Sequence, residues 1–464
     1  MKKMIWIFFL YFICCQMQAQ EGIRFEHGTW NAVLAKAKEE NKLVFIDVYT
    51  SWCGPCKKMV NEVFPRKDVG DMFNAAFVNY KIDAEKGEGI DIAKTFDVKA
   101  YPTYLFVNGD GELIYRVGGY NEPKDFIQQA DIALKEKASP KPMIKWTAEY
   151  EAGNRQKEFL IGYLQKRAIV KLPSAAIIEE LMPQLTQEDL QNKEIFGSVV
   201  YYDPNIEYVP GGKLFDYLMK NGAAADAVLG KSNEYSLRLL QFGVNNYFKK
   251  NLIPSKNEQQ AGAGIAAARK LADQLKDAGA EAAMKKMWME FYAVFGNENK
   301  LMNAITQYVD NGLMKRDLKK MQADAKAGYD KFMEPYLSGK EDSATSAQFS
   351  MMKRLKKAGD MIDYSYSLRD AAETVCRHVQ NKAMITKAIG FAKQANDIFP
   401  HFSTQAVEAA LLYKSGNAKQ AALLMQQAAQ DPFLKDQPDM KNMLLANVEK
   451  IKAGEPLKDI WRRK

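Results

Sequence analysis

Two cysteines separated by two residues stand in the segment SWCGPC, residues 51–56. A pair at this spacing can supply two ligands to zinc, close a structural disulfide, or act as a dithiol that exchanges electrons with other proteins. A structural zinc site takes four ligands. Beyond the pair and the first 20 residues, the chain offers only Cys376, His27, His378 and His401, and no second pair has ligand spacing. We therefore expect no metal at the cysteines.

The residues around the pair favour redox chemistry. Residues 42–50, KLVFIDVYT, form a continuous apolar, β-branched and aromatic run, which is typical of a buried strand. A helix is expected to begin directly after Cys53, and the free N–H groups and dipole of a helix N-terminus favour a thiolate. Cys56 follows one turn later on the same face and should be the more buried sulfur. Cys376, far from the pair, is expected to be a small buried hydrophobic residue.

The elements that position the pair alternate between helix and strand. Apolar residues at helical spacing predict a helix over 29–41 with Thr29 as its N-cap. The elements that follow are expected in the order strand, helix, strand, helix, strand, strand, helix, at 42–50, 54–64, 75–83, 90–96, 103–108, 112–117 and 122–137. The turn NGDG predicts a hairpin between the last two strands. This order predicts a mixed central sheet with helices on both faces.

Residues 22–136 resemble the thioredoxin family. The resemblance rests on WCGPC, on Asp47, on the segment YPT at 101–103, and on Gly118. It implies an α/β thioredoxin fold, a mixed central sheet flanked by helices. It also implies a catalytic redox disulfide between Cys53 and Cys56.

The resemblance implies further site residues. Asp47, six residues before the first cysteine, matches the family's Asp beneath the dithiol. Burial in an apolar strand should raise the pKa of its carboxyl and suit it to take a proton from the second cysteine. Tyr101 and Pro102 match the family's cis-proline segment, which binds the substrate backbone, and Trp52 is expected beside them in substrate binding. Tyr101 is larger than the residue usual there and should narrow the range of substrates.

The expected activity is thiol–disulfide exchange. The Gly-Pro dipeptide between the cysteines resembles the reducing members of the family, so we expect reduction of client-protein disulfides through a mixed disulfide. A disulfide isomerase or oxidase is the alternative. No Gly-rich phosphate loop follows a strand, so neither a flavin nor a nicotinamide cofactor is expected. Electrons would then come from a partner, expected to be a membrane protein.

The N-terminal residues predict export. Residues 1–19 combine a positive MKK, an apolar run of twelve residues and a polar end with Ala19, the order of a secretory signal peptide. Twelve residues fall short of the roughly 20 that span a bilayer, so no stable membrane span is expected after removal of the signal. Bulky residues before Cys14 and Cys15 argue against lipid attachment. The protein is expected to be periplasmic or otherwise exported.

The rest of the chain has helical character. A polar, proline-containing linker is expected at 137–144, followed by an all-α, solenoid-like region over 145–464, in which 387–430 weakly resemble tetratricopeptide hairpins. This region could make the protein a helical-repeat adaptor or client-binding protein, in which the thioredoxin unit mainly recognises partners. The net charge of +8 comes without a basic run interleaved with aromatics, so no nucleic-acid partner is expected.

Overall fold

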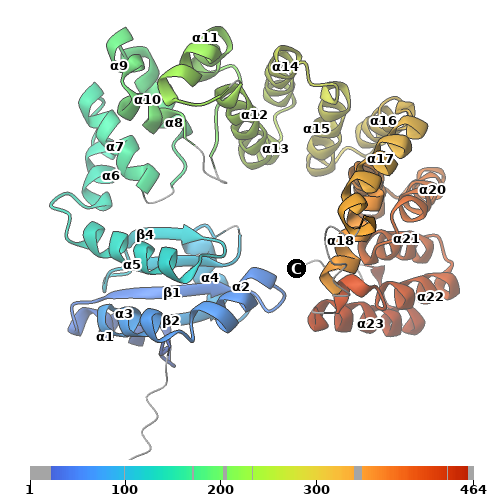
Figure 1. Cartoon of the computed structure of the whole chain (residues 1–464), viewed down its shortest axis with the longest axis horizontal. Coiled ribbons are helices and arrows are strands. Elements are labelled where there is room, and N and C mark those ends of the chain that lie inside the picture. The colour runs from blue at the N-terminus through green and yellow to red at the C-terminus, as the bar shows by residue number, and fades with distance from the viewer. Residues whose placement is uncertain are drawn as a thin grey trace, which may run out of the picture. The chain divides into compact units, whose positions relative to one another are not determined.

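The chain divides into two compact units, one ending at Ser174 and the other beginning at Ala175 (Figure 1). The computed structural model describes residues 22–98, 100–169, 172–201, 206–232, 234–338, 347–435 and 437–457. The predicted signal peptide lies outside these ranges. The finer boundaries expected from the sequence, with a linker at 137–144, stay a prediction.

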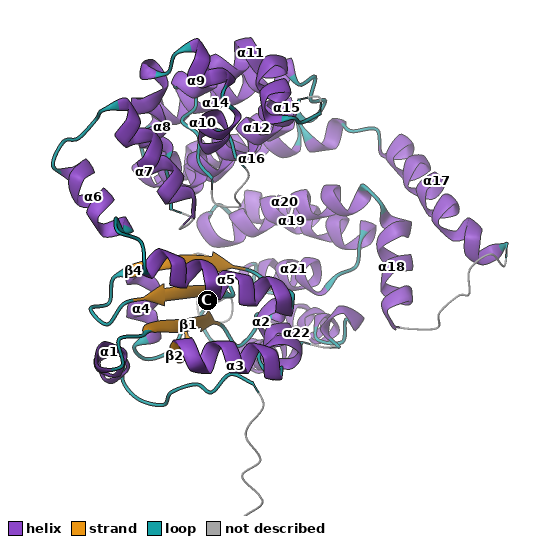
Figure 2. Cartoon of the chain, turned by 60° about the vertical axis from the view of Figure 1, so that its left-hand side comes forward, coloured by secondary structure: helices purple, strands orange, loops and turns teal. Residues whose placement is uncertain are grey.

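The first unit is built on a four-stranded mixed sheet with the strand order β2-β1-β3-β4. Its central strand β1 (Leu43–Tyr49) runs parallel to β2 (Phe77–Asp83) and antiparallel to β3 (Thr103–Val107). The edge strand β4 (Leu113–Gly118) pairs antiparallel with β3. Figure 2 shows the four strands together with helices around them. The predicted mixed sheet is confirmed.

Helices cover both faces of this sheet. On one face, α1 (Trp30–Glu39) and α4 (Gly89–Thr95) pack against the aliphatic side chains of β1, β2 and β3. On the other face, α3 (Lys67–Ala76) and α5 (Pro123–Lys137) contribute aromatic rings. The predicted N-cap is also confirmed, because the Thr29 side chain accepts a hydrogen bond from the backbone of α1.

One helix was not predicted. The sequence predicted no element between the helix at 54–64 and the strand at 75–83, whereas α3 occupies most of that interval. Pro65 separates α3 from the helix that carries the cysteines, and Val69 and Phe73, one turn apart, bury one face of α3. Strand β2 therefore begins at Phe77, two residues later than predicted.

An aromatic cluster fills the second face of the sheet. The Phe73 ring lies 4.7 Å from the Phe126 ring and 4.8 Å from the Phe45 ring, measured between centroids. Tyr104 lies 5.0 Å from Phe126. Alternate residues of a strand point to the same face, so Asp47, two residues after Phe45, also points into this aromatic layer.

Two further helices complete the described part of the first unit. They are α6 (Met143–Glu151) and α7 (Lys157–Ile169). The ammonium of Lys166 on α7 pairs with the Glu136 carboxylate near the end of α5, and it donates to Ser139 Oγ at 3.3 Å. The segment between α5 and α6 is therefore tied to α7.

In the second unit, every element is helical among the residues described, as predicted. Its helices are α8 (Ala175–Leu181), α9 (Gln187–Gln191), α10 (Lys193–Val199), α11 (Lys213–Leu229), α12 (Tyr235–Tyr247), α13 (Ile253–Ser255), α14 (Glu258–Gln274), α15 (Ala280–Phe295), α16 (Glu298–Val309), α17 (Leu318–Leu337), α18 (Ala347–Ala358), α19 (Met361–His378), α20 (Lys382–Ile398), α21 (Phe402–Lys414), α22 (Ala418–Ala428) and α23 (Pro438–Ala453). Short 3-10 and π-helical turns join some of them.

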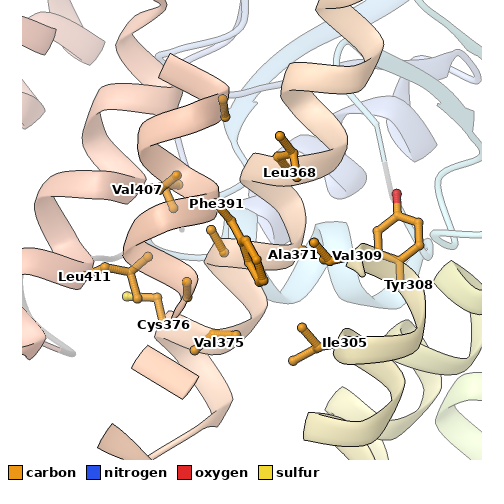
Figure 3. Packing of buried hydrophobic residues seen from close by; sticks show 14 of the residues in the cluster. Ile305, Tyr308, Val309, Leu368, Ala371, Val375, Cys376, Phe391, Val407 and Leu411 are labelled. Atoms are coloured by element: carbon orange, nitrogen blue, oxygen red, sulfur yellow. The ribbon is translucent and has the colours of Figure 1, made fainter. Parts of the chain in front are cut away.

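Neighbouring helices of this unit pack through small and branched side chains. Figure 3 shows α16, α19, α20 and α21 meeting around Phe391, Val375 and Ile305. Cys376 lies in this cluster with 2% of its surface exposed, so its expected role as a buried hydrophobic residue is confirmed. The likeness of 387–430 to tetratricopeptide hairpins stays a prediction.

Carboxylates of this unit accept hydrogen bonds from N–H groups at the starts of other helices. Glu179 accepts from the first N–H groups of α11, and Asp226 from the first two of α12. Glu298 accepts from two N–H groups immediately before α20, both at 2.9 Å. A carboxylate at a helix start satisfies free donors and interacts favourably with the helix dipole. Over the described ranges, no helix is both long and apolar enough to cross a membrane.

Replacing Phe73 by Ala should destabilise the first unit by about 3–5 kcal/mol, because it removes a fully buried ring from the aromatic cluster. Hydrogen exchange of β1 and β3 peptides, followed by mass spectrometry, measures this loss. The control is Ile90→Ala in α4, a side chain that is 51% exposed and should cost less than about 0.5 kcal/mol. Equal losses in the two variants would contradict the packing described.

Candidate active site

The cysteine pair lies at the beginning of a helix. Cys53 is the N-cap of α2 (Gly54–Lys58), which continues into a π-helical turn at Met59–Val63. Cys53 and Cys56 are joined in a disulfide, and the backbone N–H of Cys56 donates to Cys53 Sγ at 3.1 Å. The N–H of Cys53 donates to the Thr50 carbonyl at 3.2 Å. The turn that leaves β1 therefore fixes the first sulfur at the helix N-terminus.

The two cysteine residues are buried to nearly the same degree. Cys53 is 3% exposed and Cys56 is 4% exposed, so the expectation that Cys56 would be the more buried residue is wrong for this disulfide form.

Asp47 places a carboxyl group inside the sheet. It is 1% exposed, and burial raises its pKa from 3.8 to about 6, while the nearby ammonium of Lys81 opposes that rise. Asp47 Oδ2 lies 3.2 Å from Lys81 Nζ. Asp47 Oδ1 is buried and has no hydrogen-bond partner among the described residues. A carboxyl group with this pKa can hold or release a proton near neutral pH.

Lys81 is a site residue that sequence reasoning missed. Asp47 and Lys81 are each the fifth residue of their strands, and the parallel register of β1 and β2 places them directly opposite each other. The Lys81 ammonium also lies 4.6 Å from the centre of the Tyr49 ring. A charged residue at the fifth position of both strands was the available signal, but that signal becomes useful only when the register of the two strands is known.

The segment before β3 lies beside the cysteines through an aromatic contact. The Tyr101–Pro102 peptide bond is cis, as the resemblance implied. Pro102 is buried, and its carbonyl accepts from the Gly119 N–H at 2.8 Å. The Tyr101 ring lies 5.9 Å from the ring of Trp52, edge to face. This contact brings Tyr101 next to the residue that precedes Cys53.

A loop between β2 and α4 supports Trp52 from another side. Trp52 is 44% exposed, and its indole N–H donates to both carboxylate oxygens of Glu85 at 3.2 Å. Three residues on, Glu88 accepts from the Tyr80 hydroxyl at 2.5 Å and from the Trp30 backbone at 2.8 Å. Neither Glu85 nor Glu88 was identified from the sequence. The sequence of this short polar loop does not indicate which residues donate hydrogen bonds to its carboxylates.

The structure thus brings some of the predicted site residues into contact. Cys53 is bonded to Cys56, and Trp52 contacts Tyr101. Asp47 pairs with Lys81 and makes no hydrogen bond to either sulfur in the disulfide form. In the described ranges, no three His, Cys, Asp and Glu side chains come together in a group that could hold a metal ion.

Comparison with known proteins places the similarity in the first unit. The family of thioredoxin-like domains matches residues 30–133. Thioredoxin H4 of Arabidopsis thaliana is 37% identical over 96 residues, which are 21% of this chain and 76% of that protein. Thioredoxin H2-1 of Oryza sativa subsp. japonica is 34% identical over 110 residues, 24% of this chain and 73% of that protein.

A solved structure is also similar. It is the solution structure of a candidate disulphide-isomerase from Bacteroides thetaiotaomicron, with 41% identity, coverage of 25% of this chain and 95% of that chain, and a TM-score of 0.24.

Replacing Asp47 by Asn should stabilise the first unit at neutral pH. The folded protein holds the Asp47 proton more tightly than the unfolded chain does, so the wild type loses stability as the pH rises from 3.8 to about 6. Asn does not titrate. The variant should therefore exceed the wild type by up to about 3 kcal/mol at pH 7, and the difference should vanish below about pH 4.

Hydrogen exchange of the β1 peptide between about pH 4 and 8, with the disulfide intact, measures this difference. If the wild type instead gains stability relative to the variant as the pH rises through this window, burial does not dominate the titration of Asp47.

Proposed function

The chain belongs to the thioredoxin family through its first unit, and we propose that it is an exported thiol–disulfide oxidoreductase that reduces the disulfides of client proteins. The observation that carries the proposal is the bonded Cys53–Cys56 pair at a helix N-terminus, following a strand that buries the carboxyl group of Asp47. Family membership supports thiol–disulfide exchange. The Gly-Pro dipeptide between the cysteines supports reduction as its direction.

The first step is attack by Cys53. In the reduced protein its thiolate attacks one sulfur of a client disulfide, a new sulfur–sulfur bond forms, and the other client sulfur leaves as a thiolate that takes a proton from solvent. The N–H of Cys56, which donates to Cys53 Sγ at 3.1 Å in the disulfide form, is placed to stabilise the attacking thiolate. The free N–H groups at the start of α2 act in the same direction.

The second step is resolution by Cys56. Asp47 takes the Cys56 proton, the resulting thiolate attacks the Cys53 sulfur, and the second client sulfur leaves and is protonated. Two electrons pass to the client, whose disulfide becomes two thiols, while the protein dithiol becomes the disulfide. The pKa of about 6 suits Asp47 to accept a proton at neutral pH and release it afterwards.

The surface beside the dithiol would bind the client. Trp52 offers a half-exposed ring, and Tyr101 lies against that ring. The family resemblance assigns backbone recognition to the Pro102 segment. We propose that these three residues hold the client strand while its disulfide is attacked, and that Tyr101 narrows the range of clients.

The N-terminal residues support export, and an exported location bears on where the electrons come from. The signal-like order of residues 1–19 supports a periplasmic or otherwise exported location. An exported reductase needs a donor outside the cytoplasm, and we propose that a membrane protein supplies the electrons that regenerate the dithiol.

A helical-repeat adaptor is the second candidate function. It is favoured by the size of the helical unit, which runs from Ala175 to the end of the chain and far exceeds what a dithiol needs for support. In that case the first unit would recognise clients without turning them over. An isomerase or oxidase would share the cysteine chemistry but have a higher reduction potential.

The wild type should catalyse reduction of insulin by dithiothreitol, and Cys53→Ser, Cys56→Ser and the double variant should fall to the uncatalysed rate, because each lacks one partner of the exchange. Cys376→Ser, which alters a buried thiol in the other unit, is the matched control and should keep wild-type activity. If the wild type reduces insulin no faster than the double variant does, the proposed enzymatic activity is rejected.

Cys56→Ser should also accumulate mixed disulfides with clients from an exported-protein extract, because the resolving sulfur is missing. If Cys56→Ser traps clients but the wild type does not reduce insulin, the adaptor function is favoured. The reduction potential separates directions: a value near about −270 mV, that of thioredoxin, supports a reductase, whereas a value near about −120 mV, that of a strong oxidant, would contradict it.

A further inference from the structure

A second polar group lies buried next to Asp47 in the sheet. Tyr104 on β3 is directly opposite Asp47 on β1, so both side chains point to the same face. Tyr104 is fully buried, and its hydroxyl has no hydrogen-bond partner among the described residues. Asp47 Oδ1 is in the same situation. A buried acceptor and a buried donor without partners therefore occur on facing residues of neighbouring strands.

The residues around Asp47 and Tyr104 offer few other hydrogen-bond partners. Asp47 Oδ2 already has a partner in Lys81 at 3.2 Å, whereas Oδ1 is the carboxylate oxygen that lacks one among the described residues. The Tyr104 ring is packed by Phe126 at 5.0 Å, Phe45 at 5.8 Å and Phe64 at 6.3 Å, and this packing keeps its hydroxyl away from solvent. Leaving both groups unpaired would be costly, and buried polar groups are normally satisfied by protein atoms or by internal water.

A third unpaired group lies at the end of the same strand. Thr50 directly follows β1, is 1% exposed, and has a buried hydroxyl without a partner among the described residues. Its carbonyl accepts from the N–H of Cys53. An internal water needs about two to four polar partners, and Asp47, Tyr104 and Thr50 each have a buried polar atom without a partner among the described residues.

We propose that the Tyr104 hydroxyl, through one internal water, donates to Asp47 Oδ1 and is thereby a positioning residue for the proton acceptor of the reaction. The inference rests on the proposed function, because it assigns Tyr104 a role through Asp47. Tyr104 itself touches neither sulfur nor client in this role. It keeps the carboxylate ionised and oriented until the carboxylate accepts the proton of Cys56.

The electrostatics agree with Tyr104 as a donor. Burial, and then the charge of Asp47, raise the pKa of Tyr104 far above its ordinary value, so the phenol keeps its proton at every working pH. A hydrogen bond to the ionised carboxylate lowers the pKa of Asp47 and so opposes the effect of burial. The other titratable groups that interact with Asp47 are Lys81 from β2 and Tyr49 from β1.

Tyr104→Phe tests the inference, because it removes only the hydroxyl and keeps the ring in the aromatic cluster. The matched control is Tyr115→Phe on β4, which removes another buried hydroxyl on the same face, one that donates to Gln129 at 2.5 Å. Each variant is made in the full chain, both alone and combined with Asp47→Asn. Hydrogen exchange of the β1 peptide is measured over a range of pH with and without the Asp47→Asn substitution. The difference gives the pH dependence of stability that is due to Asp47.

The expected result is a rise in the pKa of Asp47 in Tyr104→Phe only, because this variant lacks the donor that favours the ionised carboxylate. At about pH 6 the ionised fraction of Asp47 should then be smaller in Tyr104→Phe than in the wild type. Disulfide reduction at about pH 6 should therefore slow by roughly twofold to tenfold in kcat, with KM unchanged, and should be nearly unchanged at about pH 8.

An unchanged Asp47 titration in Tyr104→Phe would overturn the inference, and so would an equal shift in Tyr115→Phe. The hydrogen-exchange measurement does not depend on catalytic turnover. An inactive wild type would therefore reject the proposed function but would not test the hydrogen bond from Tyr104 to Asp47. A shifted titration with an unshifted rate profile would also overturn the positioning role.

Discussion

The chemistry of the first unit depends on a charge pair held inside its sheet. Burying the carboxyl group of Asp47 in an aromatic layer disfavours its ionised form, and the cation of Lys81, 3.2 Å away, partly offsets that effect. The pair exists because β1 and β2 are in one particular parallel register. A shift by one residue would send one of the two side chains to the opposite face, and the carboxyl group would lose its partner.

The surface beside the dithiol is tied to the same sheet. Trp52 would be a loosely held exposed ring, but the Glu85 carboxylate and the Tyr101 ring hold it from two sides. The loop that carries Glu85 is anchored in turn by Glu88, which binds Tyr80 of β2 and the start of α1. A rigid frame around an exposed aromatic ring suits a site that must align a client disulfide with one sulfur, because misalignment slows exchange steeply.

The helical unit is stabilised by other means. Within the described residues the only disulfide is the one at the site, and the remaining thiol, Cys376, is buried in the helical core. Small side chains allow the helices to pack closely, and the carboxylates of Asp226 and Glu298 accept hydrogen bonds at the starts of other helices. The part of the scaffold that the structure describes therefore offers no second disulfide for the Cys53–Cys56 dithiol to attack.

The amino-acid sequence by itself determined the alternation of helices and strands, the position of the dithiol at a helix start, and the burial of Asp47. These features follow from local patterns: an apolar run, a turn, and a helix beginning at Cys53. Only the tertiary structure decided that Lys81 and Tyr104 face Asp47 and that α3 forms a separate helix. Strand register and cross-strand neighbours arise from the packing of segments distant in sequence, and no local pattern encodes which buried donor meets which buried acceptor.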